Sequence, residues 1–225
     1  MSDKEDDDLD VRPDGVEWRI ASWFPDLPDE LVGRLRVFQA ELLRFNGRIN
    51  LVSPRTEAQS DLIHFADSIL GGRIVLEHTK NERIYDIGSG NGFPGLVMAL
   101  LARERQFVLV EKDGRKSEFL RHIAGRMELK NVDIQTVRFE ELAPQSISCA
   151  VSRGFASVSR AVMTARSCCS KGCEYFHFKS ENWSTEIAEM PSQLCAFWEP
   201  SLVGTYTLPT RTTQMAIVLT KKLVE

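Results

Sequence analysis

One stretch of the sequence combines glycines and an acid at a spacing that could hold a small ligand. Residues 85–95 read YDIGSGNGFPG, in which Asp86 is followed at alternate positions by Gly88, Gly90 and Gly92. A glycine-rich turn between a strand and a helix lets a ligand press against the main chain. The spacing differs from the G-x-G-x-x-G pattern of dinucleotide sites, where a helix N-terminus receives a pyrophosphate. We expect Asp86 to repel a phosphate and to hold a cationic amine.

Side chains at the ends of the next predicted strands suit the rest of such a ligand. Glu111 closes the second strand, where a carboxylate can accept both hydroxyls of a ribose. After the third strand, Glu140, favoured over Glu141, can reach an adenine amino group while Phe139 backs the ring. Phe93 can pack against the sugar or the thioether. A ligand with ribose, adenine and a cationic amino-acid end is S-adenosylmethionine, which we favour over a dinucleotide and over a turn that binds nothing.

The fourth predicted strand ends in SRGFAS (residues 152–157), which directs Arg153 toward the same cleft. An arginine there can bind an anion, a carboxylate or the O6 edge of a guanine, or can pair with Asp86 or Glu111. The sequence has no Asn-Pro-Pro-Tyr stretch after this strand and no Pro-Cys nucleophile, and no general base stands out. This fits a ring nitrogen such as guanine N7, whose lone pair is free, so that alignment alone can supply about 7–11 kcal/mol. The catalytic residues stay unknown, with Arg153 as the candidate for positioning.

The elements that must position these residues alternate between strand and helix, which predicts a doubly wound α/β sheet of parallel strands. An antiparallel hairpin is expected at one edge. The predicted strands are 83–87, 107–111, 132–138, 148–153 and 175–179, with helices at 93–102, 114–127 and 157–169 and hairpin strands at 204–209 and 215–222.

The N-terminal part of the chain has a different pattern. The first ten residues hold six acids and one lysine, whereas the whole chain carries a net charge of −4. Leu31, Leu35, Phe38, Leu42 and Phe45 recur at helical spacing. A second helix is predicted over 56–70, and short helices over 18–30. We therefore divide the chain into an acidic tail and cap segment (1–27), a helical region (28–80) and a Rossmann-like domain (81–225).

The composition indicates the compartment of the protein and whether it binds a metal or RNA. The chain has five cysteines, no apolar run long enough to span a bilayer and no signal peptide at its start. We expect a cytoplasmic protein whose cysteines, including the CCSKGC cluster at 168–173, are buried thiols rather than metal ligands. Because the chain outside the tail is nearly neutral, RNA binding would depend on local cations. The candidates are Arg34, Arg44, Arg48, Arg115, Lys116 and Arg121.

Several motifs together resemble one family. FNGRINLVS, HFADS, YDIGSGNGFPG, VEKDGRKSEFL and VSRGFAS, in this order, are similar to the bacterial 16S rRNA guanine-N7 methyltransferases (RsmG, also called GidB), from about Val32 to Lys222. The resemblance implies a class I S-adenosylmethionine-dependent methyltransferase fold and a guanine N7 of 16S rRNA, in the small ribosomal subunit, as the acceptor.

The same resemblance implies roles for particular residues. The donor contacts would be Gly88, Gly90, Phe93, Glu111, Phe139, Glu140 and Arg153. The chain departs from the family pattern at Ile63, where a basic residue is usual, and at Lys179–Ser180, where a Lys-Gly pair is usual. These departures concern substrate contacts more than donor binding.

Other functions remain compatible with the residues alone. They are a small-molecule methyltransferase, a protein that binds S-adenosylmethionine or RNA without turnover, and, less favoured by the glycine spacing, a dehydrogenase. A monomer is favoured, and neither a membrane partner nor a metal is expected.

Overall fold

A single seven-stranded sheet organises the chain, for which the computed structural model describes residues 16–224. The acidic stretch 1–10 lies outside the described residues. The strands follow the order β3-β2-β1-β4-β5-β7-β6, and all neighbours are parallel except the pairs that involve β7. They are β1 (Arg83–Ile87), β2 (Gln106–Val110), β3 (Val132–Gln135), β4 (Ile147–Arg153), β5 (Cys169–Lys179), β6 (Trp198–Thr207) and β7 (Gln214–Lys222). The predicted parallel sheet with an antiparallel edge hairpin is confirmed.

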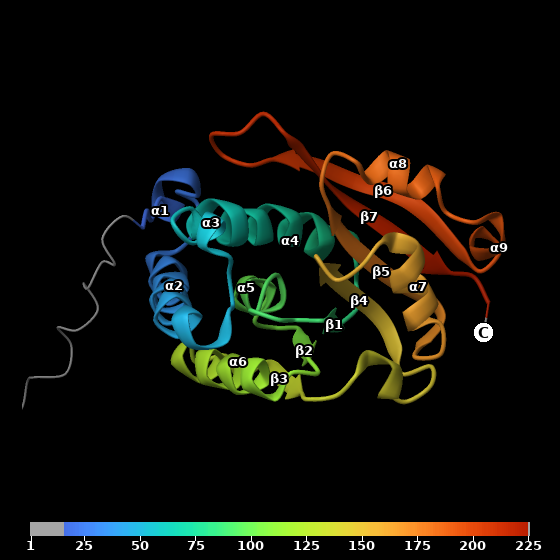
Figure 1. The fold of residues 1–225 in the computed structure, drawn as a ribbon, viewed down its shortest axis with the longest axis horizontal. Helices are drawn as coiled ribbons and strands as arrows, with labels where there is room; N and C mark the ends of the chain where they lie inside the picture. The colour runs from blue at the N-terminus through green and yellow to red at the C-terminus, as the bar shows by residue number, and fades with distance from the viewer. Residues whose placement is uncertain (1–15, 225) are drawn as a thin grey trace, which may run out of the picture.

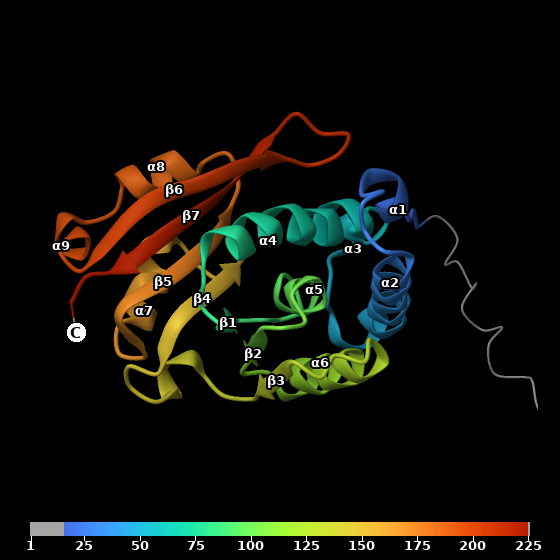
Figure 2. The same ribbon diagram turned by 180° about the vertical axis from the view of Figure 1, so that it is seen from behind.

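Helices cover both faces of this sheet (Figures 1 and 2). α2, α4, α5 and α6 lie on one face, while α7, α8 and α9 lie on the other. The helical segments are α1 (Ile20–Trp23), α2 (Asp29–Ile49), α3 (Pro54–Glu57), a π-helix (Asp61–Ala66), α4 (Asp67–His78), α5 (Gly95–Leu101), α6 (Gly114–Arg126), a 3₁₀ turn (Phe139–Glu141), α7 (Val158–Ala165), α8 (Trp183–Ala188) and α9 (Ser192–Cys195). No helix within residues 16–224 is long and apolar enough to cross a membrane.

The predicted apolar stripe places α2 against the sheet domain. Leu35, Phe38 and Leu42 are fully buried, and they belong to the same apolar cluster as residues of α5, α6 and the strands. Phe38 stacks on Phe93, which follows the glycine turn, with ring centroids 4.7 Å apart. The helical region and the sheet therefore share one core, and α2 forms a wall beside the glycine turn.

Two predicted helices have different limits in the structure. In place of the single helix predicted over 56–70, α3 begins at Pro54, and the chain continues through the π-helix into α4, which ends at His78. The helix predicted over 157–169 ends at Ala165, and β5 begins at Cys169 because that residue pairs with Ile147 of β4. The third strand is also shorter than predicted and ends at Gln135.

The cysteines occupy mostly apolar surroundings. Cys149, Cys168, Cys169 and Cys173 are buried, as predicted, whereas Cys195 is exposed. Cys168 directly precedes β5 and Cys169 begins it, so the prediction that both continue a helix was wrong. Among residues 16–224 no group of His, Cys, Asp and Glu could hold a metal ion.

The strand order brings particular chain segments together. β1, β2 and β3 run outward in one direction, and β4 returns to the other side of β1. Doubly wound sheets bind ligands at such a reversal, outside the carboxyl ends of the strands. Here the glycine turn after β1 and Arg153 at the end of β4 meet at this point.

Packing between α4 and the sheet gives a test of the fold. A Cβ on Gly71 would lie 2.9 Å from Phe178 Cδ1 and 3.0 Å from the Tyr206 hydroxyl, so an alanine there overpacks the contact. We expect Gly71→Ala to lower the free energy of unfolding by about 1–2 kcal/mol, despite the better helix propensity of alanine. Gly33→Ala in α2, with no atom within 4 Å of the added Cβ, is the control and should stabilise slightly. Urea unfolding measures both, and equal stabilisation by the two substitutions would contradict the packing described.

Candidate functional site

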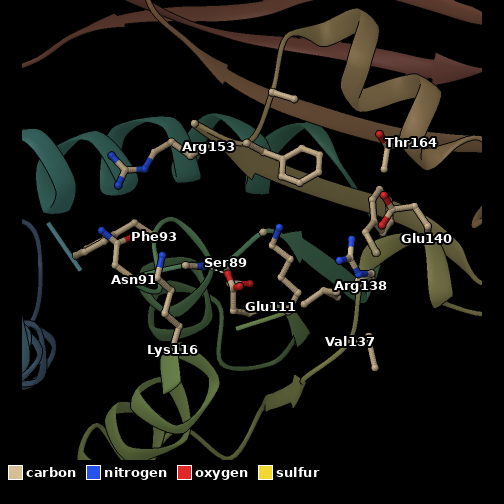
Figure 3. A pocket seen from close by; sticks show the side chains of 18 of the residues that line it. Ser89, Asn91, Phe93, Glu111, Lys116, Val137, Arg138, Glu140, Arg153 and Thr164 are labelled. Atoms are coloured by element: carbon tan, nitrogen blue, oxygen red, sulfur yellow. Dashed lines mark hydrogen bonds between the residues drawn. The ribbon is translucent and has the colours of Figure 1, made fainter. Parts of the chain in front are cut away.

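A cavity at the carboxyl ends of the parallel strands has a volume of about 800 Å³, within the usual range for ligand sites. We call it the main cavity. Its walls come from the segments after β1, β2, β3 and β4. Figure 3 shows Glu111 and Lys116 on one side and Arg153 and Thr164 on the other. The lining includes all seven predicted donor contacts, namely Gly88, Gly90, Phe93, Glu111, Phe139, Glu140 and Arg153.

The glycine turn wraps closely around the end of β2. The N–H groups of Gly88 and Ser89 both donate to the Val110 carbonyl, at 2.9 and 3.1 Å. Gly88 and Gly90 have φ values of +68° and +53°, which side chains other than glycine rarely adopt. A Cβ on Gly90 would meet only the Gly88 carbonyl, at 3.6 Å, so the turn presents main chain to open space. This is the surface that the sequence predicted for close ligand approach.

Asp86 does not have the role predicted for it. Its side chain is 1% exposed and lies under the turn, where Oδ2 accepts the Gly95 N–H at 3.0 Å. It does not line the main cavity, so it cannot receive the amine of a ligand there. Burial raises the pKa of Asp86 to about 7. Its Oδ1 has no hydrogen-bond partner among residues 16–224.

Glu111 lies where the sequence predicted a carboxylate for a ribose. It is 8% exposed, and its oxygens accept the Gly90 N–H at 2.9 Å and the Asp113 N–H at 2.8 Å. Each carboxylate oxygen can accept more than one hydrogen bond. Glu111 therefore fixes the glycine turn and keeps acceptor capacity toward the cavity.

Arg153 makes a different set of bonds from those considered in the sequence. It pairs with neither Asp86 nor Glu111. Its guanidinium donates to the Ile63 carbonyl at 3.1 Å, to Asp67 Oδ2 at 3.2 Å and to His64 Nδ1 at 2.9 Å. Burial, together with the charge of Arg153, lowers the pKa of His64 to about 3, which leaves this ring neutral as an acceptor. Arg153 thus ties the end of β4 to the HFADS segment.

This network also explains how the segment tolerates Ile63. The contact with Arg153 comes from the main-chain carbonyl of residue 63, which any residue supplies. The hydroxyl of Tyr206 in β6 donates to Asp67 Oδ1 at 2.7 Å, so both carboxylate oxygens of Asp67 are satisfied. Local sequence patterns do not indicate this third participant, since Tyr206 lies far along the chain.

The aromatic residues of the cavity differ in exposure. Phe93 is 2% exposed and stacks on Phe38, while Phe139 is buried below the 3₁₀ turn. Phe155, which the sequence analysis did not select, is 36% exposed, and a Cβ on Gly88 would lie 2.6 Å from its ring. Phe155 therefore covers the first glycine from the solvent side.

Within residues 16–224, four cations line the main cavity besides Arg153. Lys112, Lys116, Arg138 and Arg160 line it, and of these only Lys116 was among the predicted RNA contacts. The sequence could have indicated these cations, because each follows strand β2, β3 or β4. Other predicted cations are engaged elsewhere, because Arg34 binds the Met127 carbonyl and Glu128 and Arg121 binds Thr136. The positive charge near the cavity is therefore more local than the sequence suggested.

The burial of Asp86 predicts a pH dependence of stability. An unfolded aspartate has a pKa of about 3.9, below the value of about 7 in the fold. Between these values the folded chain binds more protons than the unfolded chain, so stability falls as pH rises from about 4 to about 7.

We expect Asp86→Asn, which keeps an oxygen for the Gly95 N–H, to remove this component. The unfolding free energy of the variant minus that of the wild type should rise by about 2–3 kcal/mol between pH 5 and pH 8. Urea unfolding at both pH values gives this difference, with the exposed Asp133→Asn as control. A difference that does not change with pH would contradict the raised pKa.

Known proteins are similar in sequence to this chain. A family model described as rRNA small subunit methyltransferase G matches residues 32–201. The ribosomal RNA small subunit methyltransferase G 3 of Bdellovibrio bacteriovorus is 43% identical over 209 residues, covering 92% of this chain and 95% of that protein.

Solved structures of more distant proteins share the fold. One is a SAM-dependent O-methyltransferase from Thermotoga maritima, with 14% identity and a TM-score of 0.53; the matched region covers 84% of this chain and 72% of that one. Another is a tRNA (m1A58) methyltransferase from Aquifex aeolicus, with 14% identity and a TM-score of 0.52; the matched region covers 83% of this chain and 76% of that one. The predicted class I methyltransferase fold is confirmed, and with the match over residues 32–201 the chain belongs to the rRNA small subunit methyltransferase G family.

Proposed function

We propose that this protein transfers a methyl group from S-adenosylmethionine to N7 of a guanine in the 16S rRNA of the small ribosomal subunit. The observation that carries the proposal is the main cavity, in which the glycine turn, Glu111 and the end of β4 meet. Family membership over residues 32–201 supports the choice of acceptor.

The lining of the main cavity fits S-adenosylmethionine. Gly90 leaves main chain open to a ligand, Gly88 lines the same cavity beside Phe155, and Glu111 keeps acceptor capacity for the ribose hydroxyls. Phe139 and Glu140 also line the cavity, and we assign them the contacts with the adenine. When bound, S-adenosylmethionine supplies an electrophilic methyl group. With Asp86 buried, the amine of the donor must be held by other groups of the turn, such as main-chain carbonyls.

Methylation of guanine N7 requires the protein mainly to align the acceptor with the methyl group. Guanine N7 carries a free lone pair, so no side chain has to remove a proton before transfer. His64 is an acceptor of the Arg153 guanidinium and does not line the main cavity, so it is not placed to act as a base. We assign Arg153 a positioning role, because its bonds to Ile63, His64 and Asp67 fix the end of β4 beside Phe93.

The cations of the main cavity favour RNA over a small acceptor. Lys112, Lys116, Arg138 and Arg160 line a cavity of about 800 Å³, where they can pair with the phosphates of RNA. A small uncharged acceptor would not require four cations there. We further propose that residues 28–80 supply RNA contacts to the methyltransferase domain of residues 81–225, and that the protein acts as a monomer in the cytoplasm, where its substrate lies.

The decisive experiment is to map N7-methylguanine in 16S rRNA from cells with and without the gene. We expect one position to lose the modification on deletion and to regain it with the wild-type gene but not with Gly88→Val. Purified protein should restore the same position in small subunits from the deletion strain. An identical map in both strains would refute the proposed function.

The donor contact of Glu111 gives a second prediction. Glu111→Gln keeps the size of the side chain but removes the charge that strengthens hydrogen bonds from ribose hydroxyls, which costs about 1.5–3 kcal/mol. We expect affinity for S-adenosylmethionine to fall by at least tenfold, measured by titration calorimetry. Glu199→Gln on the exposed surface of β6 is the control and should bind as the wild type does. Unchanged affinity in Glu111→Gln would exclude the ribose contact.

A further inference from the structure

A second cavity lies outside the main one, between the C-terminal end of α2 and the N-terminal end of α6. Its volume is about 330 Å³, and neither the resemblance nor the comparisons assign it a ligand. Its apolar wall and its cationic rim are formed by Phe45, Ile49, Phe119, His122, Arg48 and Arg115.

The wall presents an aromatic ring to a ligand. Phe45 is half-buried, with its ring centroid 5.6 Å from Phe119 and 5.1 Å from His122, so it is held from behind by other rings. His122 is itself fixed by a hydrogen bond to the buried Glu41. The Arg44 guanidinium lies over one face of the Phe45 ring, 5.1 Å from its centroid, and pairs with Glu41. A rigid, partly exposed ring of this kind suits stacking by a planar base.

The rim of the second cavity carries two cations whose guanidinium groups have no hydrogen-bond partner within residues 16–224. Arg48 and Arg115 are exposed and come from facing helices. Neither guanidinium has an ion pair or a hydrogen bond within residues 16–224, unlike Arg34 and Arg121. One carboxylate, Glu118, lies among the lining residues, so the rim has a net positive charge. Two free guanidiniums above an aromatic wall match the phosphate and base of a nucleotide.

The two cavities are neighbours along two chain segments. Ile49 lines the second cavity and Leu51 lines the main one, so their Cα atoms are at most about 7 Å apart. On α6, Arg115 lines the second cavity and the next residue, Lys116, lines the main one. A strand of RNA that enters the main cavity therefore passes the second one within about a nucleotide's reach.

We propose that the second cavity binds a nucleotide of single-stranded RNA adjacent to the methylated guanine, with its base on Phe45 and its phosphate on Arg48 and Arg115. The inference rests on the proposed function and adds to it a second recognition site. It gives a role to the C-terminal end of α2, which carries Arg44 and Arg48 and lies beside the methyltransferase domain. Because stacking accepts any base, this site contributes affinity and register rather than base identity.

The test compares two kinds of variant with a matched control. Arg48→Gln/Arg115→Gln removes the proposed phosphate contacts, and Phe45→Leu removes the stacking surface but keeps an apolar side chain. Arg83→Gln/Lys171→Gln removes two exposed cations, one at the start of β1 and one near the start of β5, away from both cavities. Unfolding midpoints of all variants establish that they are folded.

The readouts are KM for small subunits from the deletion strain, affinity for a single-stranded oligoribonucleotide spanning the methylated position, and affinity for S-adenosylmethionine. We expect the double arginine variant to raise KM about tenfold and to flatten the slope of log affinity against log salt by about 0.7 for each phosphate that the protein no longer neutralises. Phe45→Leu should weaken oligonucleotide binding about tenfold with the salt slope unchanged. Donor affinity and the control variant should match the wild type.

Three results distinguish the outcomes. Wild-type KM and oligonucleotide affinity in all variants would overturn the second site and leave the proposed function intact. A rise in KM with intact subunits but normal oligonucleotide binding would overturn it in favour of a contact with a ribosomal protein. If the wild-type protein itself forms no N7-methylguanine, the proposed function fails, whatever the variants do.

Discussion

The largely buried ion pair between Arg153 and Asp67 is the contact on which the arrangement of the site depends. It joins the end of β4 to the start of α4, while Tyr206 of β6 completes the bonds of the same carboxylate. Loss of one partner from such a pair leaves an uncompensated charge and typically costs about 3–5 kcal/mol. The start of α4, the carboxyl end of β4 and the edge hairpin are thereby joined to one another beside the main cavity.

Much of this arrangement could be predicted from the sequence. The predicted strands and helices alternate along the chain, and this alternation predicts a parallel sheet whose carboxyl ends lie at one edge. Gly88, Glu111, Phe139 and Arg153 each come just after or at the end of a predicted strand. Parallel strands bring their carboxyl ends to one edge, and the structure places all of these residues around one cavity for that reason.

What could not be predicted depends on side-chain direction and on distant partners. Asp86 still belongs to β1 and accepts the N–H of Gly95, the first residue of α5, so its side chain points toward that helix, whereas the glycine turn that lines the main cavity begins two residues later. The partners of Arg153 come from segments about 90 residues before it in the chain. Cys169 was predicted to continue a helix but pairs with Ile147 of β4. In each case a tertiary contact overrode what the local pattern predicted.

The contact between Phe38 and Phe93 has a consequence for the order in which the molecule is made. The apolar stripe of α2 is synthesised early, but its stacking partner and Phe119 come much later in the chain. Phe65 of the π-helix emerges soon after α2 and contacts Phe38, with ring centroids 5.1 Å apart. Domains begin to fold as they emerge during synthesis, so Phe65 covers part of the stripe first, and the contacts with Phe93 and Phe119 form only after those residues have left the exit tunnel. The wall that α2 forms beside the glycine turn is therefore completed in steps, as successive partners of Phe38 are synthesised.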